Sequence, residues 1–190
     1  MAYSSGEGFH YRKSLYGGDL PAGMNFLLDD SATFTIGDAV QVDTDGLIVR
    51  STAGEEVLGV LVGIVSDADI NVFSLDPGAA PISGATITGD DTIATSATNS
   101  TDTTRSINGK VVLDPAGAIL WYNDSSGTLA QTNLCQFFNN DANADQIDQT
   151  SASDTNGQWQ LMELDPDGDS DASKGLFRIA ENQNHPYTQD

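Results

Sequence analysis

The chain of 190 residues has little positive charge, a single cysteine and no long hydrophobic run. Seven Lys and Arg residues stand against 28 Asp and Glu residues, which gives a formal net charge of −21. Nucleic acids and anionic membranes attract proteins through Lys and Arg, so this composition argues against both partners. Cys135 cannot form an internal disulfide, and we expect it to be a small buried hydrophobe.

Hydrophobic segments long enough to cross or enter a membrane are missing. The longest apolar run, VLGVLVGIV at residues 57–65, is far short of the roughly 20 residues of a membrane-spanning helix. The N-terminal stretch MAYSSGEGFHYRK has no apolar core of a secretory signal. The sequence therefore predicts a soluble protein.

Motifs for catalysis are missing as well. The two histidines, His10 and His185, do not form a His-x-x-x-His pair, and neither Gly-x-Ser-x-Gly nor a phosphate-binding glycine loop occurs. With 28 acidic residues, chance pairs of carboxylates are expected and indicate no particular site. We therefore expect no enzymatic activity, no catalytic residue and no cofactor.

The acidic residues that are present predict strands rather than helices. Of the 28, 23 are Asp and 5 are Glu, and Asp favours turns and caps whereas Glu favours helices. Residues 33–42 and 47–50 alternate apolar and polar side chains around Asp43-Thr44-Asp45-Gly46, which is typical of a tight hairpin with Val40 and Val42 in the core. Residues 57–65 suit a central strand buried on both faces.

These patterns predict an all-β fold, a β-barrel or sandwich with a long Gly/Ser/Thr-rich excursion and an extended N-terminal arm. We expect the arm over residues 1–23, the barrel or sandwich domain over residues 24–182 with the excursion at 76–104, and a polar tail over 183–190. No period of 20–50 residues repeats convincingly.

Two acidic turns raise the question of a metal site. Asp165, Asp167 and Asp169 have the alternate spacing that calcium loops use, but Gly168 and Leu176 break the rest of that pattern. They remain a weak calcium candidate beside the simpler interpretation of a solvated turn. Asp43 and Asp45 supply too few ligands for an ion. No metal site is predicted with any other residues.

The arm concentrates scarce residue types. Arg12 and Lys13 are two of the seven basic residues, and Phe9, Tyr11 and Tyr16 flank them. Aromatic and Arg side chains are preferred anchors of protein interfaces. These five residues are the candidate binding site, and the alternative is a frayed terminus. If they form a separable arm, deletion of residues 1–20 removes binding and leaves the barrel folded.

The run IGDAVQVDTDGLIVRSTAGEEVLGVLVGIV resembles a block found in structural proteins of tailed-bacteriophage virions. The later KVVLDPAGAILWYND and TNGQWQLMELD…GLFRIA are similar to the second half of those proteins. The resemblance implies a capsid decoration (cement) protein, which binds the major capsid protein on the exterior of the virion after synthesis in the host cytoplasm. It implies no catalytic residues, and we expect a small homo-oligomer, with a trimer slightly favoured.

Two alternatives stay open at this point. One is a carbohydrate- or cell-surface-binding module of a head fibre or adhesin, for which Trp121, Tyr122 or Trp159 would have to form an exposed platform. The other is a different capsid or tail subunit. Burial in the core is the commoner fate of Trp, and an acidic chain of this size does not suit a shell surface that faces DNA.

Overall fold

The computed structural model describes residues 8–19, 21–29, 32–66, 71–74, 86–88, 107–114, 116–164, 166, 168 and 170–180. These residues form strands and one short 3-10 helix, and no α-helix occurs among them, so the predicted all-β fold is confirmed. The elements are β1 (His10–Ser14), β2 (Met24–Leu27), β3 (Thr33–Thr35), β4 (Ala39–Val42), β5 (Ile48–Arg50), β6 (Gly59–Ser66), β7 (Asn71–Ser74), β8 (Thr86–Thr88), β9 (Ile107–Leu113), β10 (Ile119–Asp124), η1 (Gln131–Asn133), β11 (Phe137–Asn140), β12 (Ile147–Ser153), β13 (Trp159–Leu164) and β14 (Lys174–Ile179).

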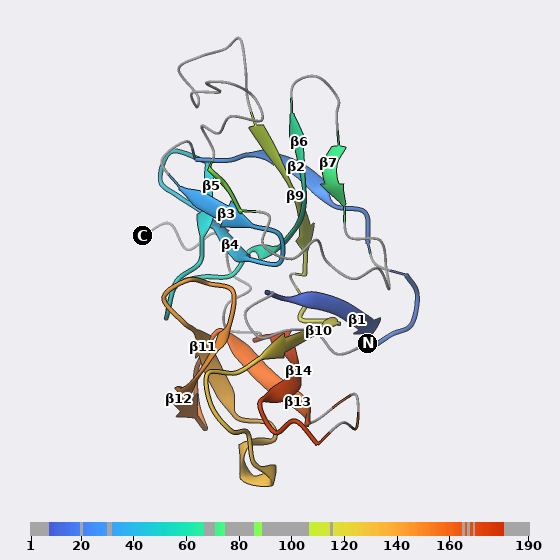
Figure 1. Cartoon of the computed structure of the whole chain (residues 1–190), viewed down its shortest axis with the longest axis vertical. Helices are drawn as coiled ribbons and strands as arrows, with labels where there is room; N and C mark the ends of the chain where they lie inside the picture. Colours follow the sequence, from blue (N-terminus) through green and yellow to red (C-terminus); the bar gives the residue numbers. More distant parts are fainter. Residues whose placement is uncertain are drawn as a thin grey trace.

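The strands build two main sheets that lie one above the other (Figure 1). One has the order β2-β9-β6-β4-β5, with β7 also paired to β6, and the other has the order β1-β10-β14-β13-β11-β12. A parallel bridge between Leu28 and Ile48 joins the end of β2 to β5, and one between Ser125 and Ile147 joins the end of β10 to β12. The first sheet therefore closes where β2 meets β5, and the second closes where β10 meets β12, with β1 paired to β10 as an additional strand. We call β2, β4, β5, β6 and β9 unit 1, and β10 to β14 unit 2.

The two units have the same topology. Numbered in chain order within each unit, the strands follow the order 1-5-4-2-3 in both, and strand 3 returns in parallel to strand 1. Five main-chain hydrogen bonds outside the regular ladders in unit 1 also have a counterpart in unit 2. In unit 1 these bonds are Asp29 N to Ile48 O, Gly37 N to Leu61 O, Leu61 N to Asp38 O, Leu58 N to Val40 O and Asp43 N to Leu47 O. Their counterparts in unit 2, in the same order, are Ser126 N to Ile147 O, Cys135 N to Leu161 O, Leu161 N to Gln136 O, Gln158 N to Phe138 O and Asp141 N to Gln146 O.

Irregularities of the backbone repeat at the same places. The pairing of β6 with β9 shifts register between Leu61 and Gly63, and that of β13 with β14 shifts between Leu161 and Glu163. A residue with positive φ precedes β4 and β11 at the matching position, Gly37 (100°) in unit 1 and Cys135 (66°) in unit 2. Bulges and positive φ angles are positional features of a backbone, so their recurrence indicates a duplicated structural unit.

The β4–β5 hairpin forms as predicted around Asp43-Thr44-Asp45-Gly46. The Asp43 carboxylate accepts the main-chain N–H groups of Asp45 (2.9 Å) and Leu47 (2.8 Å), and Gly46 takes a φ of 83°. The side chain therefore caps its own turn, as Asp does in such loops. Val40 is buried as expected, but Val42, the last residue of β4 before the turn, is exposed.

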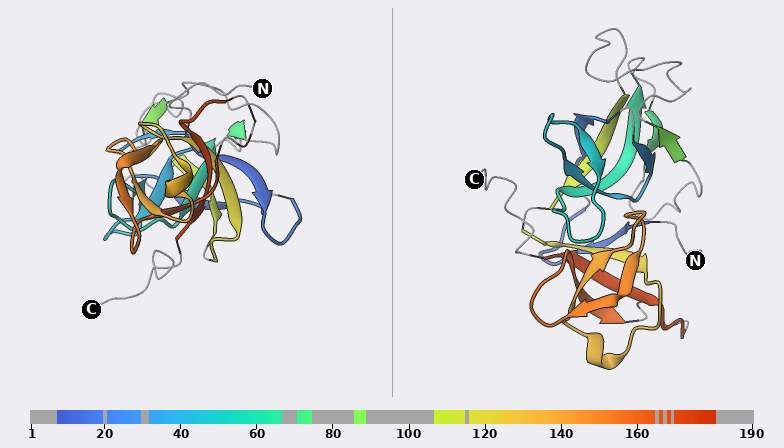
Figure 2. Two further views of the ribbon diagram at one scale, coloured as in Figure 1. Left: turned by 90° about the horizontal axis from the view of Figure 1, so that it is seen from below. Right: turned by 90° about the vertical axis from the view of Figure 1, so that its left-hand side faces the viewer.

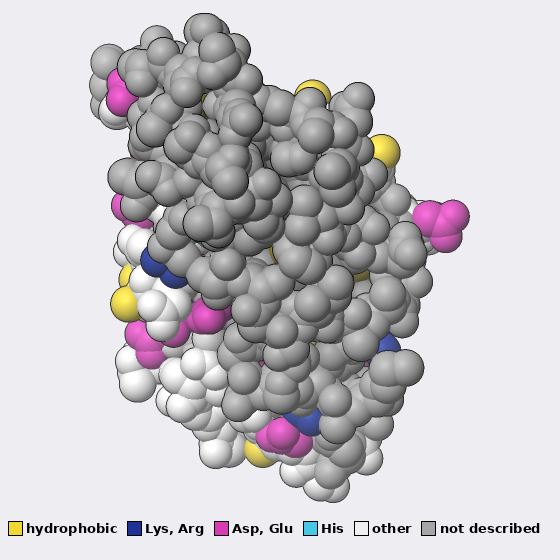
Figure 3. Space-filling view, turned by 45° about the horizontal axis from the view of Figure 1, so that its top comes forward, with side chains coloured by type: hydrophobic (Ala, Val, Ile, Leu, Met, Phe, Trp, Pro, Cys, Tyr) yellow, Lys and Arg dark blue, Asp and Glu magenta, His cyan; other side chains and the backbone are white. Residues whose placement is uncertain are grey.

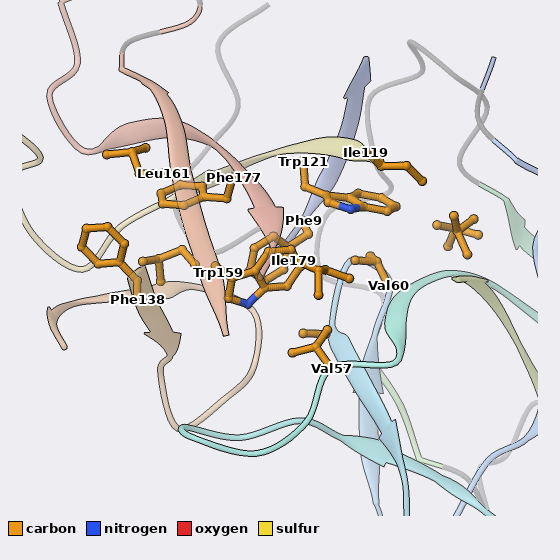
Figure 4. Packing of buried hydrophobic residues seen from close by; sticks show 14 of the residues in the cluster. Phe9, Val57, Val60, Ile119, Trp121, Phe138, Trp159, Leu161, Phe177 and Ile179 are labelled. Carbon is orange, nitrogen blue, oxygen red and sulfur yellow. The ribbon is translucent and has the colours of Figure 1, made fainter. Parts of the chain in front are cut away.

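Successive side chains of β6 and β9 point to opposite faces and pack into two separate hydrophobic cores. Leu61 and Val111 point into the interior of unit 1, where they pack with Leu28, Phe34, Val40 and Ile48. Their neighbours Val60 and Val112 point outward and join a larger cluster formed mainly by unit 2. Figure 4 shows Val57 and Val60 beside Trp121, Trp159 and Ile179. The outer face of unit 1 thus covers the apolar end of unit 2.

A buried polar network also joins the units. Gln158, which is fully buried, contacts the segment between β5 and β6 of unit 1 and the start of its own unit's β11–β12 turn. Its amide nitrogen lies within hydrogen-bonding distance of Ser51 Oγ (2.9 Å), Thr52 O (2.9 Å) and Glu55 O (2.7 Å), and its Oε1 accepts Gly54 N (3.1 Å) and Asn140 N (2.8 Å). A buried amide with every polar atom partnered fixes a single arrangement of the segments around it. The two units therefore pack as one body.

The structure corrects the predicted N-terminal arm. Residues 10–14 form β1, which pairs antiparallel with β10, and Phe9 is fully buried, so the compact part begins before Met24. The excursion over 76–104, apart from β8, and the tail over 183–190 lie outside the described residues. Cys135 is exposed rather than buried, because it occupies a turn with positive φ at the surface.

Candidate interaction surface

The five residues predicted as a binding site separate into core and surface. Phe9 stacks on Trp159 with ring centroids 3.9 Å apart and an interplanar angle of 14°, and it belongs to the cluster between the units (Figure 4). Tyr11 is half-buried against the same cluster, and its hydroxyl donates to the carbonyl of Gly18 over 3.0 Å. Both side chains stabilise the fold, and Arg12, Lys13 and Tyr16 remain exposed.

A bulge in β1 explains why two successive basic residues face solvent. The register against β10 shifts between Tyr11 and Lys13, so Arg12 is the extra residue. A bulge on an edge strand interrupts the alternation of side chains and redirects them. Lys13 then forms an ion pair with Glu163 of β13 at 2.9 Å. Because both of these side chains are about half exposed, the pair adds little stability.

Large exposed hydrophobic side chains gather in one short stretch. Among the described residues five are exposed, and four of them lie between positions 15 and 27. They are Leu15 (42%), Tyr16 (85%), Met24 (55%) and Leu27 (37%), and the fifth is Val42 (44%). Singly scattered exposed hydrophobics are ordinary, so their concentration within one segment makes that segment the candidate contact surface. We call residues 15–27, of which residue 20 is not described, the connecting segment.

The connecting segment leads from unit 2 back to unit 1. It begins after β1 and ends with β2, and Figure 2 shows its turn projecting sideways from the rest of the described body. Leu15 N donates to Ala118 O (2.8 Å) and Gly17 N donates to Ser14 O (3.2 Å), which fixes where the turn leaves β1. Gly17 and Gly18 both have positive φ, the conformation that glycine adopts without strain.

Among the described residues, no other segment carries more than one exposed large hydrophobic side chain. On the face drawn in Figure 3, acidic side chains lie at separate places around the described region and hydrophobic ones appear only as small isolated spots. Trp121 and Trp159 are fully buried and Tyr122 nearly so. The exposed aromatic platform that a carbohydrate-binding module would need is therefore not formed by these three residues.

One group of carboxylates lies where the units meet. Asp38 is buried, and its Oδ2 accepts Thr35 N over 2.7 Å while its Oδ1 has no hydrogen-bond partner. Burial raises the pKa of Asp38 to about 8; the Thr35 N–H and the Arg50 charge oppose the shift, and Asp145 and Asp141 add to it. Burial also raises the pKa of Asp145, with the nearby Asp141 charge in support. Arg50 Nη1 donates to Asn143 O (3.2 Å) in the same region.

These carboxylates do not make a metal site. In the part of the chain that the structure describes, no group of three or more His, Cys, Asp or Glu residues could hold a metal ion. Asp165, Asp167 and Asp169, the calcium candidates, lie outside the described residues. Just after them, hydrogen bonds from Ser173 lower the pKa of Asp171, whose carboxylate closes the turn before β14.

The described residues contain no helix that is both long and apolar enough to cross a membrane. Comparisons of the chain with protein-family models, with curated proteins and with solved structures each gave no match.

The candidate residues from the sequence include Tyr16, which is the most exposed large hydrophobic side chain among the described residues. They do not include the other three exposed side chains of the connecting segment. Leu15, Met24 and Leu27 were not singled out, because an apolar residue in a strand pattern normally points to the core. The signal lies in β2 itself: with only four residues and little polar alternation, MNFL is unusual for a half-buried strand.

Proposed function

We propose that the protein is a non-enzymatic structural protein of a bacteriophage virion, which binds the major capsid protein on the outside of the shell and reinforces the contacts between capsomers. The observation that carries the proposal is the concentration of exposed Leu15, Tyr16, Met24 and Leu27 in one segment of a strongly acidic chain. The resemblance of residues 36–65 to virion proteins supports it.

Charge supports an exterior position. A protein with a formal charge of −21 is repelled by packaged DNA and stays soluble before assembly. The repulsion between copies is screened beyond roughly 8 Å at physiological salt, so many copies can occupy one shell. Each added contact stabilises the assembled state by mass action.

Rigidity supports a cementing role. The two units share one apolar cluster and the Gln158 network, so a force applied to one unit is transmitted to the other without a hinge. A clamp between neighbouring capsomers needs such a body, because an internal hinge would yield before the shell contacts did. In this proposal the protein forms a small homo-oligomer, with a trimer slightly favoured.

The test is co-sedimentation with purified shells that lack the protein. Wild-type protein is expected to pellet with the shells and to raise the temperature at which they open. A Leu15→Ser, Tyr16→Ser double variant is expected to bind at least tenfold more weakly. Val42→Ser is the control, since Val42 is exposed to the same extent as Leu15 but lies on the β4–β5 hairpin. Wild-type protein that stays entirely in the supernatant contradicts the proposal.

A further inference from the structure

Because the unit is duplicated, the edge of β2 in unit 1 can be compared with the equivalent edge of β10 in unit 2. Residues 119–122 of β10 pair with β1, and the pairing of Trp121 with Phe177 in unit 2 matches that of Met24 with Val111 in unit 1. Residues 22–25 of unit 1 are therefore equivalent to residues 119–122 of unit 2. In unit 2 the equivalent residues pair with β1, which raises the question of which strand pairs with residues 22–25.

Of the strands that the structure describes, β9 is the one that pairs with β2 along Met24–Leu27. In unit 2 the corresponding strand β10 lies between two partners, β14 on one side and β1 on the other. The exposure of the β2 side chains is consistent with the lack of a second neighbouring strand among the described residues. Met24 is 55% exposed, whereas its equivalent Trp121 is fully buried under Phe9 and the facing unit.

An exposed strand edge with apolar side chains is a template for another strand, and proteins normally protect such edges with Lys, Pro or a bulge. β1, the edge strand of the other sheet, carries that protection: a bulge at Arg12 and the charges of Arg12 and Lys13. β2 has the sequence MNFL, with neither charge nor bulge. An apolar strand edge that lacks this protection indicates that the edge is used.

We propose that the edge of β2 that faces away from β9 accepts an antiparallel strand from the major capsid protein, a strand with the chemistry of β1 in which aromatic and basic residues adjoin. The pairing of β1 with β10 shows what the duplicated unit accepts at this position, GFHYRKS at residues 8–14. Charge favours a basic strand of another protein over a second copy of this chain. A second copy also carries −21, whereas a basic segment is attracted to this chain.

The identity of the partner rests on the proposed function, and the experiment separates the two. Amide hydrogen exchange is measured on the full chain, free and bound to empty shells. Strand addition is expected to slow exchange at least tenfold within residues 22–27, which contact through side chains alone would not do. Met24→Lys and Leu27→Lys each place a repelling charge on the edge at an exposed position, and each is expected to weaken binding at least tenfold. Val42→Lys is the control and should bind as wild type.

The results of these experiments distinguish failure of the strand-acceptor proposal from failure of the proposed function. If wild-type protein binds shells, but exchange at residues 22–27 is unchanged and both Lys variants bind normally, the proposed function stands and the strand-acceptor proposal is wrong. If sedimentation instead reveals oligomers that either Lys variant dissociates, β2 joins copies of this chain and the capsid strand is wrong.

If wild-type protein does not bind shells, the proposed function fails, and the edge is tested with the synthetic peptide GFHYRKS. Slower exchange at residues 22–27 with the peptide, and no change with GFHYEES, supports a strand acceptor for basic segments. No protection by either peptide overturns it.

Discussion

The aromatic rings of Phe9 and Trp159 stack 3.9 Å apart, so a residue near the N-terminus forms part of the core of the C-terminal half. The contact also lies where Val57 and Val60 of unit 1 meet unit 2. Phe9 is therefore structural, and residues 10–14, which form β1, are part of the fold and not a separate arm.

Phe9→Ala is expected to lower the free energy of unfolding by about 3–5 kcal/mol, because it leaves a cavity beneath Trp159. Chemical denaturation monitored by Trp fluorescence measures the change. Tyr16→Ala is the control and should alter stability by less than about 0.5 kcal/mol, since that side chain is exposed. An unchanged midpoint for Phe9→Ala contradicts the stacking. Deletion of residues 1–20 would likewise destabilise the fold rather than remove an arm.

Gln158→Ala is expected to destabilise the protein by several kcal/mol, because the buried N–H and C=O groups around it lose their partners at once. Gln131→Ala, at an exposed position of η1, is the matched control. Differential scanning calorimetry reads both changes. In wild type the two units should unfold in a single transition, and two well-separated transitions would show that the units are not coupled as described.

Because the pKa of Asp38 is raised, we expect the free energy of unfolding to fall as the pH rises. Its folded-state pKa of about 8 is raised above the ordinary value of 3.8, so the folded protein retains a proton that the unfolded chain has released. The stability present below about pH 4 is therefore lost progressively toward pH 8, by at most about 1.4 kcal/mol per pH unit from this group. Asp38→Asn, which keeps an acceptor for Thr35 N, should flatten the profile in that window. A profile that is identical in both proteins would show that Asp38 is ionised in the fold.

Cys135→Gly is expected to raise stability by about 0.5–1 kcal/mol. A side chain at φ 66° costs about 1–2 kcal/mol, and glycine removes this strain while losing part of the gain to the greater freedom of the unfolded chain. Unit 1 already has Gly37 at the matching position. Cys135→Ala keeps the Cβ and should bring no gain. If both variants behave alike, the left-handed conformation is not a source of strain.

Local features of the fold were predictable because local chemistry determines them. The Asp43–Gly46 hairpin and the central strand at residues 57–65 follow from turn residues and apolar runs, and both are present. The burial of Val42 was predicted wrongly because alternation assigns a face but does not tell where the core ends. The arm was misjudged because an edge strand with a bulge loses its alternation.

The duplication could not be read from the sequence, since the features that repeat are main-chain hydrogen bonds and φ angles. Equivalent side chains have different tasks: Val60 and Val112 face unit 2, whereas Gln160 and Arg178 at the same positions bond to each other over 2.8 Å. Met24 and Trp121 differ for the same reason, because one is exposed and the other is covered. The exposed edge of β2 is recognisable only once the units are compared.

Binding of this protein to the outside of a capsid, as proposed, is tested most directly by electron cryo-microscopy of empty shells incubated with the purified chain. Regular protrusions are expected at symmetry-related positions, joined to the shell through density at residues 15–27. Smooth shells, or protein bound only at random positions, would contradict the proposal.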